Sequence, residues 1–557
     1  MSIFFFTTLT LIVYILSSYL FTNVNTKTFS KLCIHTINGS IYLTIFAIVL
    51  NFFLPLNLQI NSIIFLIIVL AALSIRGVKN LQKNIIFRYL LILSFFIFVM
   101  IFLADSNRPD SGLYHYPFIG LINNEKISFG ITNINVRFGV ISSLQYLQAI
   151  NNNLLFGFNG MTLPIAILPS VIFLYFVFEI FRFKKLKNRN YLYLIFLFLS
   201  LIFFTYKMNR YGAYGNDFLG HYMIFYMISL LIKMKRKIDL TAIIFYCTYL
   251  FTLKITHLYI FILPIILLFN FNTKIKINKS FFISIFFIFI WFLKTLFHTA
   301  CIIWPVNKSC FQNLFWFNSY HKPNSAKFLS NIGEAWSKGW PAKIKKYANF
   351  EDYNQNFEWF HVWLGSHGLF IAKVISIYFL ILFLILYFLK KIKKIKYNNH
   401  IKDTDKKILF NILIVFLLGL VVWFFKYPVY RFGIAPIIIP IITIILLVNI
   451  KIKLTNKHIN LIKKISIFCI LIFIGKNLIK FKNFDYYYNN YPWPKFYSFD
   501  NKNNHEFKKK IYINDNDFYL LSEKLCMYTR YICNNEQLPD KLKLKKILNY
   551  KFYYYDN

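Results

Sequence analysis

Long apolar runs recur along most of this chain, and they limit its fold more than any other feature. Most runs have about 20 residues with almost no charge, the length that an α-helix needs to cross the hydrocarbon core of a bilayer. We predict about fourteen such helices. They are expected at residues 2–21, 34–54, 60–76, 85–104, 160–181, 191–206, 216–232, 240–253, 255–270, 281–298, 369–389, 408–425, 430–449 and 463–479. The sequence therefore predicts an all-α integral membrane protein that crosses the bilayer many times.

Short basic segments separate these runs at regular intervals and indicate an orientation. The basic segments are residues 184–189, 233–237, 274–279, 390–396 and 451–464. By the positive-inside rule they face the cytoplasm, which explains the formal charge of +42 without a nucleic-acid ligand. We expect a multi-pass protein of the bacterial inner (plasma) membrane. The N-terminus and five segments are then extracytoplasmic: 105–136, 207–215, 299–368, 426–429 and the tail from residue 480.

The predicted helices and the connections between them divide the chain into five parts. They are N-terminal transmembrane helices (1–84), a transmembrane core (85–300), a large external loop (301–368), C-terminal transmembrane helices (369–479) and a small external tail domain (480–557). The core includes a first external loop at 105–136 and a segment at 137–150. This segment is too short and too polar to cross, and its apolar residues recur at helical spacing. It is expected to form an amphipathic helix in the membrane interface.

Acidic side chains concentrate on the predicted external surface. Glu179 alone falls in the interior of a predicted span, whereas a proton-coupled transporter usually places ionisable groups at mid-membrane. The first external loop begins Asp105-Ser-Asn-Arg-Pro-Asp-Ser-Gly-Leu-Tyr-His115. It brings two carboxylates, an Arg, a Tyr and a His to the surface, with Asp105 interpreted as the boundary with water.

Carboxylates and cations on one surface have the chemistry needed to transfer a sugar from a lipid phosphate. The acceptor must lose a proton to a carboxylate, or bind a metal held by one, and cations must bind the leaving phosphate. We predict as catalytic residues Asp110 (general base or metal ligand), Asp217 (second carboxylate) and His115 (orientation of donor or acceptor). The predicted substrate-binding residues are Arg137, Lys254, Arg431 and Tyr114. The cofactor stays open, with a divalent metal ion as one candidate.

Each of these residues also has a purely structural interpretation. Asp110-Ser-Gly suits a turn or a helix N-cap, and Asp217 suits the N-cap of the next helix. His115 is flanked by tyrosines and suits an interfacial anchor. Lys254 could extend out of the membrane, and Arg431 could be an ordinary interface residue.

The cysteines fall into two groups. Cys526 and Cys533 are expected outside and close enough in sequence to form a disulfide in an oxidising compartment, and Cys301 and Cys310 are a second candidate pair. The sequence leaves both disulfides open. The remaining cysteines are expected to be unpaired in or beside membrane helices: Cys33, Cys247 and Cys469.

The first loop resembles that of the GT-C glycosyltransferases, the class that depends on lipid-linked sugars. More closely, Pro109-Asp-Ser-Gly-Leu-Tyr-His-Tyr-Pro117 and Val136-Arg-Phe-Gly139 are similar to a bacterial family of GT-C-like polytopic proteins. Further similar segments follow in order: Asn216-Asp217, Lys254-Ile-Thr256, Ile303-Trp-Pro-Val306, Ala335-Trp336, Tyr430-Arg-Phe432 and the Cys526/Cys533 pair. The resemblance implies a GT-C-like transmembrane bundle.

Chemistry and resemblance together predict a membrane glycosyltransferase. It would use a polyprenyl-phosphate-linked sugar to modify a cell-envelope glycan or lipid on the extracytoplasmic side. The expected partners are the bilayer, this donor and a glycan or lipid acceptor, with no nucleic acid. The alternatives are a transporter or flippase, or a polymerase, of lipid-linked glycans.

Overall fold

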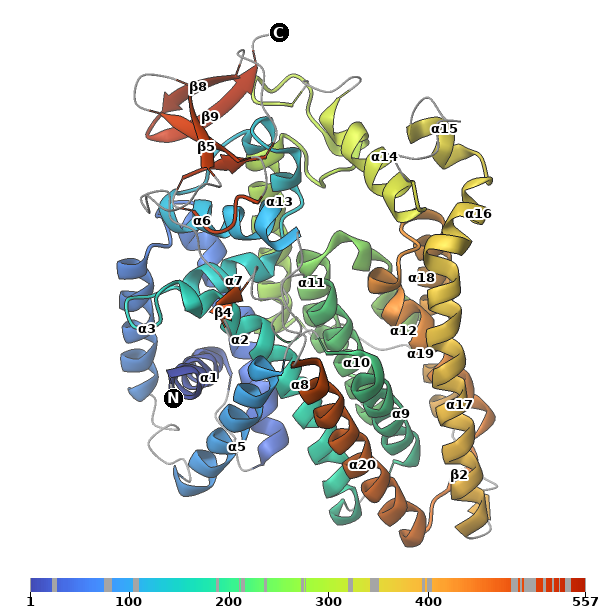
Figure 1. The fold of residues 1–557 in the computed structure, drawn as a ribbon. Helices are drawn as coiled ribbons and strands as arrows, with labels where there is room; N and C mark the ends of the chain where they lie inside the picture. The colour runs from blue at the N-terminus through green and yellow to red at the C-terminus, as the bar shows by residue number, and fades with distance from the viewer. Residues whose placement is uncertain are drawn as a thin grey trace.

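The computed structural model shows a bundle of long helices with short helices, loops and strands at one end (Figure 1). The structure describes residues 2–22, 28–74, 83–103, 110–186, 190–209, 211, 216–234, 238–271, 275, 277–318, 324–340, 350–392, 396–397, 403–481, 489–490, 493–494, 507–513, 517–522, 525–529, 531–535 and 542–555. The predicted boundary residue Asp105 and parts of the basic segments lie outside these ranges.

Ten helical stretches among the described residues are long and apolar enough to cross a membrane. They contain α1 (Ser2–Phe21), α2 (Phe29–Asn51), α5 (Lys83–Phe102), α8 (Leu163–Arg182), α10 (Asn216–Met234), α13 (Lys279–Thr299), α17 (Leu369–Ile392), α18 (Asp403–Lys426), α19 (Tyr430–Val448) and α20 (Asn456–Phe481). Shorter apolar helices are α3 (Leu58–Leu73), α9 (Tyr191–Lys207), α11 (Leu240–Leu253) and α12 (Ile262–Phe271), which continues a 3₁₀ turn at Ile255–Phe261. These positions agree with the predicted segments, and the fold is that of a helical, multi-pass membrane protein.

Side-chain caps set several of the helix boundaries. Asn57, Asn190 and Asn278 each accept a hydrogen bond from the backbone N–H three residues on, at the starts of α3, α9 and α13. Such caps satisfy a donor that the first helical turn leaves unpaired. Lys254 has an extended backbone (φ −159°) and interrupts the chain between α11 and the 3₁₀ turn, as its position between two apolar runs predicted.

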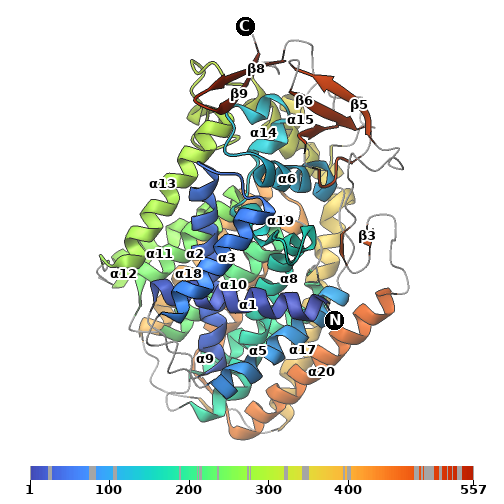
Figure 2. The same ribbon diagram turned by 90° about the vertical axis from the view of Figure 1, so that its left-hand side faces the viewer.

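The two ends of the bundle differ in chemistry. At one end lie the described basic connections, where β1 (Lys396–Tyr397) pairs with β2 (Ile452–Lys453). We call this the basic end, and the opposite end, which carries most of the short helices and the longer strands of the tail, the pocket end (Figure 1). α1 differs from the other long helices, because it runs across the bundle rather than along it (Figures 1 and 2). The expected external position of the N-terminus assumed that α1 runs parallel to the others.

Short helices form most of the pocket end. They are a π-helical turn (Ser111–His115), α6 (Tyr116–Asn124), a 3₁₀ turn (Val136–Gly139), α7 (Ser143–Asn151), α14 (Ser325–Ser337), α15 (Phe350–Gln355) and α16 (Trp359–Trp363). The predicted interfacial helix at 137–150 is corrected in two respects. The helix begins at Ser143, and every one of its residues is buried. Its polar side chains are compatible with burial because they bond to protein groups, as Gln145 does to the Ser142 N–H.

The tail is a β-structure and not a helical one (Figure 2). It contains β3 (Asn489–Asn490), β4 (Trp493–Pro494), β5 (Phe507–Tyr512), β6 (Phe518–Ser522), β7 (Cys533–Asn534), β8 (Leu542–Ile547) and β9 (Tyr550–Tyr555). β5, β6 and β7 form one sheet, and β8 and β9 form a hairpin. Both candidate disulfides are present, Cys301–Cys310 and Cys526–Cys533, and the other three cysteines are free, as predicted.

Candidate functional site

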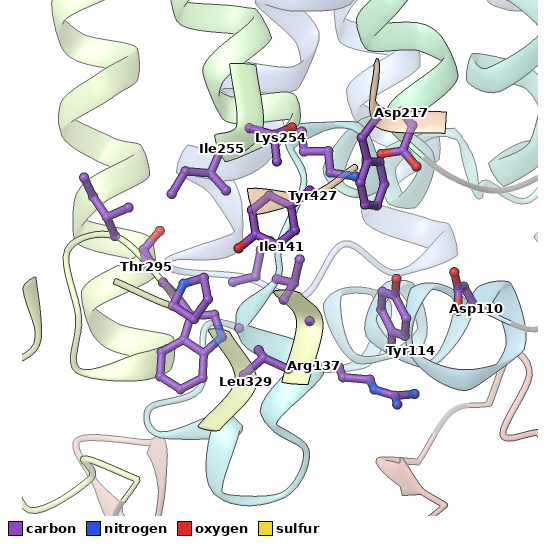
Figure 3. A pocket seen from close by; sticks show the side chains of 18 of the residues that line it. Asp110, Tyr114, Arg137, Ile141, Asp217, Lys254, Ile255, Thr295, Leu329 and Tyr427 are labelled. Carbon is purple, nitrogen blue, oxygen red and sulfur yellow. The ribbon is translucent and has the colours of Figure 1, made fainter. Parts of the chain in front are cut away.

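One pocket at the pocket end is lined by all seven predicted site residues. The cavity has a volume of about 410 Å³, within the size range of small-molecule sites. The seven residues are Asp110, Tyr114, His115, Arg137, Asp217, Lys254 and Arg431. They come from segments more than three hundred residues apart in the chain, and Asp110, Tyr114 and Arg137 lie together at one side of the pocket in Figure 3.

Asp110 precedes the π-helical turn but does not cap it, since its side chain makes no capping hydrogen bond. Instead its Oδ2 accepts a hydrogen bond from Arg431 Nη1 at 2.9 Å. Oδ1 has no hydrogen-bond partner among the described residues. The N-cap interpretation is therefore wrong, and one carboxylate oxygen of Asp110 is available to a ligand.

Asp217 has both carboxylate oxygens engaged. It lies in the first turn of α10, where Oδ1 pairs with Lys254 Nζ and Oδ2 lies 3.8 Å from Arg431 Nε. Burial lowers the pKa of Lys254, and the charge of Asp217 opposes this shift. Asp217 therefore holds two cations in place, and neither Lys254 nor Arg431 is an unpaired interface residue.

Arg137 is the cation of the pocket whose side chain has no ion-pair or hydrogen-bond partner among the described residues. It lies on the 3₁₀ turn at Val136–Gly139, and Asn135 caps this turn by accepting a hydrogen bond from the Arg137 N–H. Gly139 packs on Trp304, where a Cβ atom would lie 2.4 Å from the indole Nε1. A permanently charged guanidinium without a carboxylate is suited to an anionic ligand such as phosphate.

His115 is buried and neutral, not an interfacial anchor. The Ser142 N–H donates to Gln145 Oε1, which leaves Gln145 Nε2 to donate to His115 Nδ1 at 3.2 Å. Burial lowers the pKa of His115 to about 4, with Lys254 and Arg431 adding to the shift and Asp110 and Asp217 opposing it. His115 can therefore donate a hydrogen bond through Nε2 at neutral pH.

The pocket continues from this polar side into an apolar side. Ile255 and Thr295 lie away from Asp110 and Tyr114 in Figure 3, and Trp291, Ile302, Ile303 and Leu329 also line the cavity. Burial of the hydroxyl, followed by the charge of Asp110, raises the pKa of Tyr114. A neutral Tyr114, an apolar wall, and a carboxylate oxygen and a guanidinium that have no partner among the described residues share one cavity, which suits an amphiphilic anion.

The tail holds the segment at residues 110–136 in place. The Met527 N–H donates to the Gly112 carbonyl at 2.8 Å, and a Cβ at Gly112 would meet Met527 Sδ at 2.5 Å. Asn135, which caps the turn of Arg137, donates through Nδ2 to Asn534 Oδ1 at 3.1 Å. Met527 lies inside the loop closed by the Cys526–Cys533 disulfide. The segments that carry Asp110 and Arg137 therefore both depend on tail contacts.

The sequence interpretation assigned no site role to several residues that line or support the pocket. Trp304, Trp336 and Tyr427 line the cavity from the large external loop and the α18–α19 connection. His221 positions Arg431, because its Nε2 donates to the Arg431 carbonyl at 2.8 Å while its Nδ1 accepts from the Ala435 N–H. The available signal was its position four residues after Asp217, on the same helix face.

The donor set does not fit the candidate divalent metal ion. No group of three or more His, Cys, Asp or Glu side chains suited to a metal occurs in the described part of the chain. The two pocket carboxylates are already neutralised by Lys254 and Arg431. We therefore derive no step through a metal.

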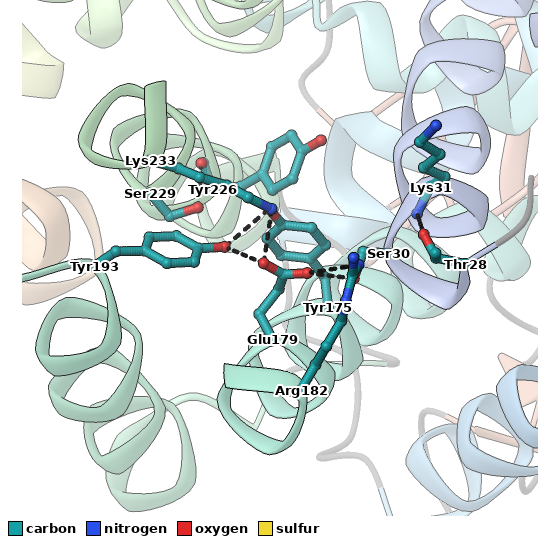
Figure 4. Close-up of polar contacts among 10 residues, drawn as sticks. All are labelled: Thr28, Ser30, Lys31, Tyr175, Glu179, Arg182, Tyr193, Tyr226, Ser229 and Lys233. Carbon is teal, nitrogen blue, oxygen red and sulfur yellow. Dashed lines mark hydrogen bonds and ion pairs between the residues drawn. The ribbon is translucent and has the colours of Figure 1, made fainter. Parts of the chain in front are cut away.

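A second carboxylate cluster lies at the basic end (Figure 4). Glu179 accepts hydrogen bonds from Ser30 at 2.5 Å, Tyr193 at 3.0 Å and Lys233 at 2.7 Å. Arg182 Nη1 lies 3.8 Å from the carboxylate. Both oxygens of Glu179 are engaged, which is the usual condition for a buried charge.

Fold and site define a multi-pass helical membrane protein with a charged, part-apolar pocket at one end of its bundle. The chain belongs to a family of domains of unknown function, DUF8201, whose model matches residues 1–438. All residues that line the pocket fall within this match. Neither the curated proteins nor the solved structures include a match to the chain.

Proposed function

We propose that the protein is a GT-C-type glycosyltransferase that takes a sugar from a polyprenyl-phosphate donor. The observation that carries the proposal is that one cavity with an apolar wall holds both Asp110, one of whose carboxylate oxygens has no partner among the described residues, and the Arg137 guanidinium, which likewise has none there. The resemblance of the first loop to GT-C proteins points to the same class. The pocket end is then extracytoplasmic, and the basic end cytoplasmic.

In the proposed reaction Asp110 Oδ1 takes the proton of an acceptor hydroxyl. The acceptor oxygen forms a bond to the anomeric carbon of the donor sugar, and the bond from that carbon to the phosphate oxygen breaks. Polyprenyl phosphate leaves with the bonding electron pair, and Arg137 stabilises its charge. Arg431 holds the Asp110 side chain in the pocket, and Asp217 fixes Arg431 and Lys254.

Binding of polyprenyl phosphate to the purified protein in nanodiscs tests the proposal. Arg137→Gln is expected to raise the Kd about tenfold, the equivalent of about 1.4 kcal/mol. Arg182→Gln is the matched control, because it removes the same charge at the basic end and should leave the Kd unchanged. Equal Kd values for wild type and Arg137→Gln would reject the phosphate site.

The proposed orientation is tested separately with reporter fusions in cells. A reporter after residue 320 should be active outside the cytoplasm, and one after residue 398 inside it. The reverse pattern would place the pocket on the cytoplasmic side.

A further inference from the structure

Trp336 is a half-exposed aromatic side chain in the lining of the pocket. It lies on α14, lines the cavity, and keeps 49 % of its surface accessible. Leaving much of an indole exposed to water is unfavourable, because burial of apolar area is stabilising. An exposed indole that faces a cavity instead of packing in the core suggests a ligand that covers it.

The helix that carries Trp336 is fixed on its other side. Leu329, Ile332, Gly333 and Trp336 recur at helical spacing and face the pocket. Glu334 points elsewhere, to Lys338 at 2.6 Å and to Lys426 at the end of α18 at 2.9 Å. The pair with Lys426 joins α14 to the end of α18, whereas the pair with Lys338 lies within the last turn of α14.

The surroundings of Trp336 leave room for a six-membered ring. Gly333 precedes it by three residues, and a Cβ there would find no atom closer than Tyr427 Cε1 at 4.0 Å. The guanidinium carbon of Arg431 lies 5.1 Å from the Trp336 ring centroid, and the same guanidinium binds Asp110. A ring placed on the indole would lie beside the side chain that aims the proposed base.

We infer that Trp336 is the platform of a carbohydrate subsite that stacks on the C–H face of a pyranose ring. The weakly positive C–H groups of a pyranose suit the electron-rich face of an indole, as cations do. The sugar hydroxyls would remain free for Asp110 Oδ1. The assignment of this ring to the acceptor, rather than the donor, rests on the proposed function, because the ring beside the base must be the one that loses a proton.

Protection of Trp336 from oxidation tests the subsite without an activity assay. The full-length protein in nanodiscs is treated with N-bromosuccinimide, and oxidation of each tryptophan is followed by mass spectrometry. Methyl pyranosides of glucose, galactose, mannose and N-acetylglucosamine serve as probes, with sorbitol as the open-chain control. At least one pyranoside is expected to slow oxidation of Trp336 relative to the other tryptophans.

Two results of this experiment overturn the inference. One is protection of Trp336 by no pyranoside beyond the effect of sorbitol. The other is protection by polyprenyl phosphate alone, which would make Trp336 part of a lipid site.

Kinetics then test which substrate the platform holds. With saturating donor, Trp336→Ala should raise the acceptor KM about tenfold, equivalent to about 1.4 kcal/mol, and Trp336→Phe should restore most of the affinity. Phe311→Ala is the control, since Phe311 is equally exposed but does not line the pocket. An unchanged acceptor KM in Trp336→Ala, with transfer still dependent on Asp110, would reject the platform and leave the proposed function intact.

Discussion

The carboxylate clusters at the two ends of the bundle contain similar residues, but they differ in how many of their donors and acceptors are paired. At the basic end Glu179 meets Ser30, Tyr193, Lys233 and Arg182, and both of its oxygens are engaged. At the pocket end Asp217 is equally engaged, yet in the described part of the chain one oxygen of Asp110 and the Arg137 guanidinium have no partner. A buried carboxylate with both oxygens paired joins helices, whereas donors and acceptors without a protein partner beside a cavity can bind a ligand.

The largest expected difference between the ends is in activity. Glu179→Gln leaves Lys233 and Arg182 without their carboxylate. Asp217→Asn leaves Lys254 without its carboxylate, whereas Arg431 keeps Asp110. Each should lower stability by about 1–3 kcal/mol, with Glu179→Gln near the lower limit because Lys233 is partly exposed. Asp217→Asn should also reduce sugar transfer at least tenfold, because Arg431 then loses one of the two carboxylates that hold it. The measurement is transfer per folded molecule in nanodiscs.

The outcome that would contradict this comparison is loss of transfer in Glu179→Gln at normal folded yield. The basic end would then take part in function, and a transporter or flippase would become the better interpretation.

The comparison also predicts that the stability of the folded protein depends on pH through His115, at the pocket end. His115 has a pKa of about 4 in the folded protein and about 6.5 when unfolded. The unfolded chain therefore binds more protons between these values, so stability is complete above pH 6.5 and falls as the pH drops towards 4, by about 3 kcal/mol at most. Thermal denaturation in detergent at pH 7.5 and pH 5 measures this loss.

His115→Gln should reduce the difference between the two pH values, because Gln does not titrate. Glu179→Gln should retain the wild-type pH response from His115. An identical response in wild type and His115→Gln would show that His115 does not lose its proton affinity on folding.

The bundle was predictable because its signal is local. Each apolar run predicts its own helix, and the position of Lys254 between two such runs correctly predicted a break between two helical segments. The crosswise direction of α1 has no local signal, since it depends on packing: Tyr14 of α1 accepts a hydrogen bond from Asn151, 137 residues away. The strands of the tail were missed, although the longer ones pair with their neighbours in the sequence. The contacts that attach the tail to the first loop have no local signal.

The charged members of the pocket were predictable, but the residues that position them were not. Asp110, Arg137 and Arg431 could be singled out because each falls on or beside the predicted external surface, where the acidic side chains concentrate. Asn534 contacts Asn135, 399 residues away in the sequence, and Asn135 caps the turn that carries Arg137. A single sequence carries no sign of this contact. Trp336 resembles any interfacial tryptophan until the cavity beside it is known.

The smallest expected effect concerns the tail. Asn534→Ala removes the hydrogen bond to Asn135, worth about 1 kcal/mol. Hydrogen exchange should therefore rise in residues 131–139 and remain unchanged around Glu179. Exchange that rises equally at both ends would mean that the tail stabilises the whole bundle and not the pocket.

The central claim is that the free oxygen of Asp110 takes a proton during sugar transfer. Asp110→Asn keeps the shape of the side chain, and its Oδ can still accept from Arg431. The measurement is polyprenyl-phosphate binding and sugar transfer on the same nanodisc sample. The account predicts a Kd close to that of wild type with transfer lower by about 10²–10⁴-fold. Transfer near the wild-type rate, at an unchanged Kd, would contradict it.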